Sequence, residues 1–434
     1  MNIVIFTPAI RSSAIGRMAA IVVRELLARG HEVHVVRAES EALQVHPTHD
    51  FGVECLPWMS PRVADVVAAA DLVSHQIGNS FDYHEGNLHW LDSAPGLVSL
   101  HDFYLGHLFF GWACQHVEEA KRELVRWYGV GAGDAFFAHA NDASFIDLTR
   151  DSMPMTEWIA SRAIGVVTHS SWGVARVLDA CAGPVWTLPL AYDAHGEASD
   201  RSARDPDADV AVLTVGHVNP NKRVDQVIQA IGSSELLRRR IVYRIVGRAE
   251  PSMQAHLSAL AQSLDVRIVI SGEVDDAVLE QAFSQADIVT CLRWPSLESA
   301  SASAIEAMLH GKPTLVTDNA FYSELPDDCV VKIHMDDERN EIRTSLESLC
   351  TDVAGAHALG DRARVWARHM FTAAKYADGL EALASPFRRA LWLKRGAEAI
   401  SGYLRSWHGG MHWMGTPSLA DVTDIIGTES HTSD

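Results

Sequence analysis

The first forty residues alternate short apolar runs with one amphipathic segment. The apolar run Asn2–Thr7 predicts a buried strand, and Glu32–Val36 predicts a second one. Between them, Gly16–Ala28 has apolar residues at the three- and four-residue spacing of a helix, which Gly30 ends. A strand, a helix and a strand in this order favour a parallel sheet that is covered by helices.

The same alternation continues through the first half of the chain. Further short apolar runs predict strands at Asp71–His75, Gly96–His101, Ile164–His169 and Val185–Leu188. Helical patterns lie between them, near 82–93, 104–128, 142–162 and 171–181. Residues 1–194 are therefore expected to form one doubly wound α/β domain.

Residues 195–209 interrupt the pattern, because they are polar, small and acidic, and we expect them to be a linker. The alternation then begins again. The second half predicts strands at Ala211–Val215, Val242–Val246, Val266–Ile270, Ile288–Cys291, Thr314–Thr317 and Val330–Ile333. Its predicted helices are 224–238, 252–263, 276–285 and 302–310, followed by long helices between 340 and 405.

The predicted architecture is thus two doubly wound domains, 1–194 and 210–375, in tandem. Helices over 376–409 are expected to pack back on the first domain, and 410–434 has no periodicity and is predicted to be a tail. Ligands of open α/β sheets lie beyond the carboxyl ends of the strands. The expected binding site is therefore the cleft where the two domains face each other.

Composition narrows the kind of protein. The 36 basic and 56 acidic side chains give a charge of −20, which argues against a protein that wraps the nucleic-acid backbone. Apolar residues make up 47%, which excludes a disordered chain. The six cysteines include no CxxC pair, so we expect free thiols in a reducing compartment. The N-terminus has no secretory pattern and no apolar stretch approaches about 20 residues. A cytoplasmic protein with at most peripheral membrane contact is expected.

The segment 293–318 holds the sharpest candidate site. A strand is predicted to end near Cys291, and after a loop a helix begins near Ser301. The first turn of a helix presents unpaired N–H groups and the positive end of its dipole, and the small residues there let a ligand approach. Glu298 lies at the edge of this predicted pocket and Glu306 inside the helix. The alternative is that Glu298 is a helix-capping acid and Glu306 a solvated surface residue.

A second candidate lies between 215 and 231. A strand is predicted to end at Gly216, and Lys222 and Arg223 stand at the start of the next helix. Cations are disfavoured at a helix N-terminus, so two of them there suggest a compensating anion. The alternative is two solvated basic residues. Gly247-Arg248 repeats the strand-end arrangement more weakly.

The first domain offers less specific signals. Gly16 lies between a strand and a helix, but no GxGxxG or GxxxxGK[ST] motif surrounds it. His101 follows a strand directly and should lie at the ligand edge of the sheet, although a structural histidine is the default interpretation. No HExxH motif or Cys/His cluster indicates zinc, and no GxSxG motif indicates a serine hydrolase. The sequence predicts no metal site.

Taken together, these segments resemble the retaining GT-B glycosyltransferases of the large family four. Glu298 and Glu306 match the E-x7-E motif of that family, and Glu306–Pro313 (EAMLHGKP) matches the segment that follows it. Gly216–Lys222 matches the G-x5-K segment. IGNSFDYH (77–84) and GLVSLHDFYLGHL (96–108) resemble a bacterial branch associated with polysaccharide assembly. The resemblance covers residues 1–380 and implies two Rossmann-like domains that face each other across a cleft.

The resemblance also implies roles for residues. Glu298 would hold the hydroxyls of the donor sugar, Glu306 would hold the nucleotide ribose, and His101 would lie beside the reacting centre. Lys222 would neutralise the leaving diphosphate. His217 stands where the family often has arginine, so Arg223 is expected to supply the second cation. The expected catalytic residues are His101, Lys222 and Glu298; the expected nucleotide-sugar pocket comprises Gly16, Gly216, His217, Lys222, Arg223, Gly247, Ser299, Ala300, Ser301 and Glu306.

The implied reaction moves a hexose from a nucleotide diphosphate sugar to a glycan, lipid-linked or small-molecule acceptor, with retention and without a cofactor or a metal ion. Positive groups of the protein would stabilise the charge that gathers on the leaving phosphate. Two alternatives stay open: a nucleotide-sugar epimerase of the same fold, and a non-catalytic paralogue that binds a nucleotide sugar.

Overall fold

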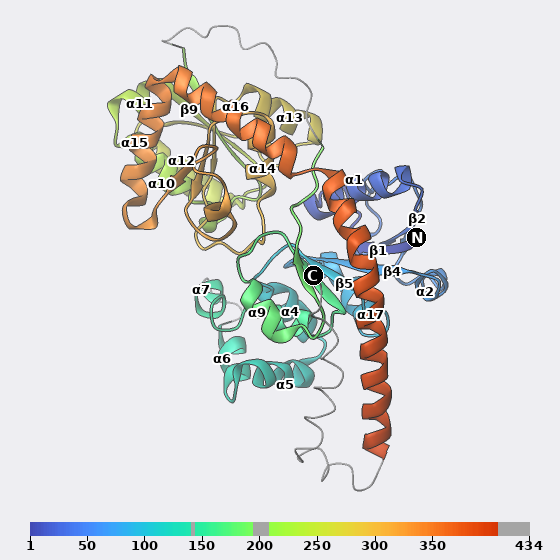
Figure 1. The fold of residues 1–434 in the computed structure, drawn as a ribbon. Helices are drawn as coiled ribbons and strands as arrows, with labels where there is room; N and C mark the ends of the chain where they lie inside the picture. The colour runs from blue at the N-terminus through green and yellow to red at the C-terminus, as the bar shows by residue number, and fades with distance from the viewer. Residues whose placement is uncertain (140–143, 194–207, 407–434) are drawn as a thin grey trace, which may run out of the picture.

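The computed structural model describes residues 1–139, 144–193 and 208–406 of the chain. Two parallel sheets, each with helices on its faces, form two domains, as Figure 1 shows. The predicted fold class, two doubly wound α/β domains, is confirmed. The predicted linker 195–209 lies almost entirely outside the described residues, and the predicted tail 410–434 lies wholly outside them.

The first sheet has seven parallel strands in the order β3-β2-β1-β4-β5-β6-β7. The central strands are buried along their whole length, because helices cover both faces of the sheet. The order reverses between β1 and β4, which opens a crevice beyond their carboxyl ends. The strands are β1 (Asn2–Thr7), β2 (Glu32–Arg37), β3 (Cys55–Pro57), β4 (Leu72–Ile77), β5 (Leu97–Leu100), β6 (Gly165–Thr168) and β7 (Val185–Thr187).

The second sheet has six parallel strands in the order β10-β9-β8-β11-β12-β13. Its order reverses between β8 and β11, so the carboxyl ends of these two strands mark the second crevice. The strands are β8 (Val210–Val215), β9 (Ile241–Val246), β10 (Arg267–Ile270), β11 (Ile288–Cys291), β12 (Thr314–Thr317) and β13 (Val331–Ile333).

Helices separate the strands in both domains. The first domain contains α1 (Ala14–Ala28), α2 (Arg62–Ala68), α3 (Phe81–Leu91), α4 (Gly106–Ala113), α5 (Val117–Tyr128), α6 (Ala132–Ala138), α7 (Phe145–Thr149), α8 (Thr156–Ala160) and α9 (Val174–Ala180). The second contains α10 (Val224–Gly232), α11 (Glu235–Arg240), α12 (Pro251–Ser263), α13 (Asp276–Gln285), α14 (Ala302–Leu309), α15 (Glu338–Thr351) and α16 (Val353–Met370).

Some predicted boundaries were wrong. The helix predicted over 104–128 is two helices, α4 and α5, and the helix predicted over 142–162 is interrupted between α7 and α8. The second break has a local cause: Pro154 disfavours a helical conformation of the residue before it, and Met155 has a left-handed φ of 62°. The edge strand β3 was not predicted, because three residues are too few to show a period.

The last helix, α17 (Ala373–Ser406), returns to the first domain and runs along it (Figure 1). The Arg29 guanidinium at the end of α1 lies 2.7 Å from Asp378 and 3.2 Å from Glu381 of α17. The Tyr376 hydroxyl lies 3.0 Å from Ser99 Oγ. Apolar residues of α17 complete the core on this side of the first sheet, among them Leu380, Leu383 and Phe387.

The two domains also meet beside the cleft. The Ser299 amide donates to the His101 carbonyl oxygen at 2.8 Å, and the Phe103 amide donates to the Leu297 carbonyl oxygen at 2.8 Å. Ser299 Oγ accepts a hydrogen bond from the His169 amide at 3.0 Å. The loop that carries Glu298 is therefore held by backbone hydrogen bonds to the first domain.

Candidate active site

A cleft of about 930 Å³ lies between the domains at the carboxyl ends of both sheets. Both domains line it, as the position of the two crevices requires. The first domain contributes Ile10, Arg11, Ser12, Ser13, Ala14, Arg17, Leu43, His46, Pro47, His49, Tyr83 and Tyr192. The second contributes Val215, Gly216, His217, Lys222, Val246, Gly247, Arg248, Glu273, Val274, Asp276, Leu279, Arg293, Glu298, Ser301, Ala302, Ser303 and Glu306.

Lys222 lies in the base of this cleft. After β8 the chain turns at Gly216, and a short 3₁₀ helix, η2 (Pro220–Lys222), brings the lysine back to the end of the strand. Its Nζ donates to the Val215 carbonyl oxygen at 2.9 Å. Burial, with the nearby charge of Arg293, lowers the pKa of Lys222 to about 7. The ammonium group is therefore unstable here without an anion beside it.

Two glycines make room for this lysine. Gly216 has a φ of +103°, and a Cβ there would lie 2.7 Å from Lys222 Nζ. Gly247, at the end of β9, has a φ of +148°, and a Cβ there would lie 2.1 Å from the Gly216 carbonyl oxygen. Both positive φ values favour glycine, and at Gly247 a side chain would also collide with the backbone of Gly216.

Arg293 is a second buried cation in the cleft, and no sequence pattern indicated it. It follows the carboxyl end of β11 and is 4% exposed. Its Nη1 donates to the Leu292 carbonyl oxygen at 2.8 Å, and its Nη2 donates to Ser303 Oγ at 3.2 Å. Its Nε lies 3.4 Å from Glu298 Oε1. The guanidinium thus joins the predicted sugar-binding glutamate to the start of α14.

Glu298 is not a helix cap. The N-cap of α14 is Ser301, whose Oγ accepts from the Ala304 amide. Glu298 lies in the loop before it, where its carboxylate accepts a hydrogen bond from the Tyr322 hydroxyl. Tyr322 and Arg293 both contact Oε1 of this carboxylate, and these two contacts hold the side chain in place at the cleft.

Glu306 is not a solvated surface residue either. It is 6% exposed, and its carboxylate pairs with the Arg17 guanidinium of α1, in the opposite domain. The Arg17 guanidinium also lies 5.8 Å from the ring centroid of Tyr192. Both glutamates of the motif therefore reach the cleft, and Arg17 is a further cleft cation that sequence patterns did not indicate.

The small residues before α14 divide into two groups. Ser301, Ala302 and Ser303 line the cleft at the first turn of the helix. The predicted ligand contacts Ser299 and Ala300 do not line it, because Ser299 uses its amide and its hydroxyl to bind the first domain. This part of the cleft lining thus begins at Ser301, two residues later than expected.

Gly16 also lies elsewhere than expected. It is inside α1, where its amide donates to Ser13 Oγ, and it does not line the cleft. A Cβ at this position would lie 2.2 Å from the Pro8 carbonyl oxygen, so the glycine permits the helix to pack on the preceding loop. Ser13, Ala14 and Arg17 are the residues around it that line the cleft.

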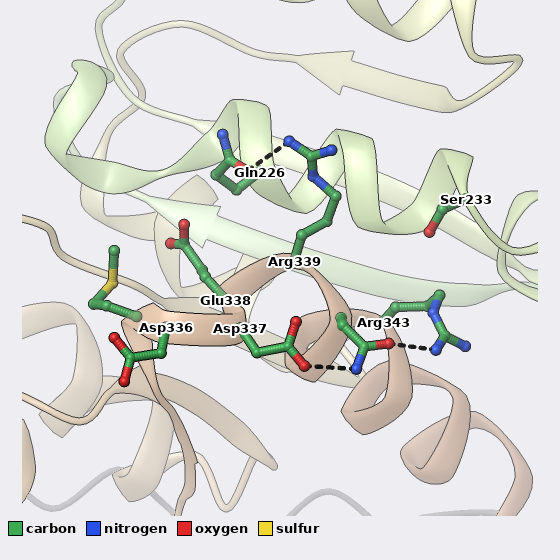
Figure 2. Close-up of a pocket in the computed structure, with 9 residues that line it drawn as sticks. Gln226, Ser233, Asp336, Asp337, Glu338, Arg339 and Arg343 are labelled. Carbon is green, nitrogen blue, oxygen red and sulfur yellow. Dashed lines mark hydrogen bonds between the residues drawn. The ribbon is translucent and has the colours of Figure 1, made fainter.

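Arg223 does not line the cleft, so the expectation that it supplies the second cation there is wrong. Its side chain makes a two-pronged bond to Glu338. Glu338 lines a separate surface pocket of about 450 Å³ between α10 and the start of α15, which Figure 2 shows. In that pocket Arg339 Nη2 donates to Gln226 at 3.4 Å. A carboxylate 115 residues away, not a ligand, compensates the charge of Arg223.

The two predicted histidines differ in exposure. His217 is exposed and lines the cleft. His101 is buried behind the Glu298 loop, with its Nε2 2.8 Å from Gln76 Oε1 and its ring 4.7 Å from that of His169. Burial, with a contribution from His169, holds the pKa of His101 well below its usual range. It does not line the cleft, but its carbonyl oxygen binds the Ser299 amide.

Part of the second half of the chain matches a known family. Residues 197–366 match the model of the family "Glycosyl transferases group 1". No curated protein matches the chain. The resemblance to a glycosyltransferase is thereby confirmed over the second domain.

Solved structures share the fold across both domains. Anabaena Alr3699/HepE, in complex with UDP and glucose, superposes with a TM-score of 0.59 at 16% identity, over 89% of this chain and 100% of that one. Sucrose-phosphate synthase from Thermosynechococcus elongatus superposes with a TM-score of 0.58 at 14% identity, over 92% of this chain and 99% of that one. WaaG, a glycosyltransferase involved in lipopolysaccharide biosynthesis, superposes with a TM-score of 0.53 at 16% identity, over 87% of this chain and 98% of that one. The chain has the GT-B fold of these enzymes.

Proposed function

We propose that this protein is a retaining glycosyltransferase, because residues 197–366 match the model of the group 1 glycosyl transferases. It moves a hexose from a nucleotide diphosphate sugar to a glycan, lipid-linked or small-molecule acceptor, in cytoplasmic synthesis of a bacterial polysaccharide or glycoconjugate. The structure of HepE with UDP-glucose supports this class of donor.

One observation carries the proposal. Lys222 and Arg293 are 8% and 4% exposed and line the same cleft. Among the residues that line the cleft, one carboxylate, that of Glu298, lies within 4 Å of either cation. Burying a cation without a partner is costly, and the lowered pKa of Lys222 reflects this. A diphosphate would supply the missing negative charge.

The reaction follows from where that charge develops. When the bond between the anomeric carbon and the phosphate oxygen breaks, negative charge gathers on the β-phosphate. Lys222, Arg293 and the residues at the start of α14 line the same cleft, and their positive groups would stabilise this charge. Glu298 would hold the hydroxyls of the hexose and Glu306 those of the ribose.

Retention then needs no carboxylate nucleophile. The acceptor hydroxyl would attack from the face that the phosphate leaves, so the new carbon–oxygen bond forms as the old one breaks. The acceptor proton would pass to the leaving phosphate oxygen. Ser12 Oγ and the Tyr83 hydroxyl lie 3.1 Å apart on the first-domain side of the cleft and would orient the acceptor.

A ligand screen tests the donor class first. We expect one nucleoside diphosphate among UDP, GDP and dTDP, and its sugars, to raise the melting temperature. Incubation with acceptors should then release that diphosphate and give a product whose anomeric configuration, read by NMR, matches the donor. Lys222→Ala should lower turnover by at least about 10²-fold.

Other outcomes identify the alternatives. Conversion of the free nucleotide sugar without any acceptor would show an epimerase, and binding without turnover on any acceptor would show a non-catalytic paralogue. Because protein cations occupy the place of a metal ion in this scheme, EDTA should leave the rate unchanged. A strict Mg²⁺ requirement would contradict it.

A further inference from the structure

The second half of α17 has an apolar face that is exposed to solvent. Trp392, Leu393 and Ile400 are 72%, 52% and 57% exposed. In Figure 1 this part of the helix runs past the body of the first domain. Large exposed apolar side chains that cluster on one helix normally mark a binding surface.

Basic residues share this face. An α-helix advances 100° per residue, so side chains three or four positions apart lie on one side. Arg388, Arg389 and Arg395 are four residues before, three before and three after Trp392, and all three are exposed. Arg388 lies 3.9 Å from Asp71, and the described structure gives Arg389 and Arg395 no ion pair. We call these six residues the basic apolar face.

The orientation of the face is fixed by contacts on the opposite side of the helix. Leu383 and Phe387 are buried in the core of the first domain, and Leu391 packs against it. Further along, Lys394 Nζ donates to the Arg162 carbonyl oxygen at 2.9 Å. The helix therefore cannot turn Trp392 inward without breaking these contacts.

We propose that the basic apolar face binds the surface of a membrane that contains anionic lipids. A tryptophan flanked by aliphatic and basic side chains on one helix face is the pattern of helices that lie in the lipid interface. The arginines are a local exception in a chain of net charge −20, so the surface they match is negative. The described part of the chain has no helix that is long and apolar enough to cross a bilayer, so the contact would be peripheral.

Charge disfavours a second copy of this chain as the occupant. Pairing two basic apolar faces in a symmetric dimer would bring the arginines of both helices together. Repulsion between like charges at close range would then oppose the gain from burying the apolar residues. Anionic headgroups would instead neutralise the arginines, while the side chains of Trp392 and Ile400 enter the interface.

Vesicle flotation with the full chain tests the proposal. We expect the protein to float with vesicles of phosphatidylcholine mixed with phosphatidylglycerol, much less with phosphatidylcholine alone, and less as salt is added. Trp392→Ser should weaken the binding about tenfold. Arg389→Glu with Arg395→Glu should weaken it at least about 25-fold, because each basic residue near the surface contributes about 1 kcal/mol.

Matched controls separate this face from a general charge effect. Arg122→Glu with Arg126→Glu makes the same change of charge on exposed positions of α5 and should leave binding unchanged. Val130→Ser, at a site 98% exposed, is the control for Trp392→Ser. Absence of binding to anionic vesicles would overturn the proposal, as would equal loss in the control pair. Donor binding is measured separately, so failure here leaves the proposed transferase function untouched.

Discussion

Lys222 shows what one residue can reveal about the reaction. Two features of the sequence pointed to it: the turn after the strand and a cation at the start of a helix. The structure adds that its ammonium group is buried next to Arg293, which lowers the pKa to about 7. A lysine in this state is charged only when the solution is acidic enough or when an anion arrives.

A pH dependence of donor binding follows. The bound diphosphate favours the charged lysine, so binding takes up a proton when the free protein has lost it. Below pH 7 the lysine is already charged and affinity should be constant. Above pH 7 affinity should fall, by up to about tenfold per pH unit. Calorimetric titration with a nucleotide sugar measures this, because each of its two phosphates has a single, strongly acidic hydroxyl and does not itself titrate near pH 7.

Lys222→Arg is the control for this titration. An arginine stays charged throughout the range, so the affinity of the variant should not depend on pH between 6 and 9. If the wild-type protein also bound with constant affinity across this range, the lysine would not be the group that meets the diphosphate.

Arg223 and Arg293 make a contrasting pair of residues. The sequence selected Arg223, because it could show its place at a helix start but not Glu338, its partner 115 residues later. It passed over Arg293, because a single arginine after a strand belongs to no periodic pattern. Its burial in the cleft depends on how β11 and β12 pack. Local motifs were enough to predict the two glutamates and the lysine. The positions of the two arginine side chains depend on contacts with residues far away in the sequence.

The two arginines should respond to mutation in opposite ways. Arg293→Met removes a charge from the cleft and should lower turnover by about 10²–10³-fold. Arg223→Met leaves Glu338 buried without its partner and should cost about 1–3 kcal/mol of folding stability, with turnover unchanged. Steady-state kinetics and urea denaturation of both variants measure this. Comparable losses of turnover would mean that Arg223 turns into the cleft.

At the scale of elements, the two strand ends that hold Lys222 depend on a close approach of their backbones. Hydrophobic periodicity predicted the strands β8 and β9 and the doubly wound fold class of both domains. It could not predict the breaks near His116 and Pro154 or the docking of the Glu298 loop on the first domain. These features depend on turn geometry and on hydrogen bonds between residues far apart in the sequence.

Gly247→Ala tests the close approach. Its Cβ would lie 2.1 Å from the Gly216 carbonyl oxygen, so β9 must shift away from β8. Gly272→Ala in the same domain is the control, since its φ is +70° but nothing lies within 4 Å of the added Cβ. The control should cost about 1–2 kcal/mol in urea unfolding from backbone strain alone. Gly247→Ala should cost clearly more and should also weaken donor binding.

At the scale of the molecule, charge in the cleft differs from charge elsewhere. The whole chain has a net charge of −20. In contrast, the cleft is lined by five basic side chains (arginine or lysine) and four acidic ones. Two of these side chains, Arg17 and Glu306, pair across it. On another side, Glu324 of the second domain accepts hydrogen bonds from the Ser171 and Trp172 amides of the first. With the Ser299 contacts, these groups hold the domains together around the cleft.

We expect these contacts to set how often the empty protein is closed. Arg17→Met combined with Glu324→Ala removes two of them and should increase the radius of gyration in small-angle X-ray scattering. If the closed form falls to about a tenth of the population, apparent donor affinity falls about tenfold. Saturating donor should then restore the compact form. Arg24→Met is the control. Arg24 lies seven residues further along the same helix and pairs at 3.6 Å with Asp193 of its own domain, so its loss should change neither the radius of gyration nor donor affinity. An unchanged radius in the double variant would show that the backbone bonds of Ser299 suffice to keep the cleft closed.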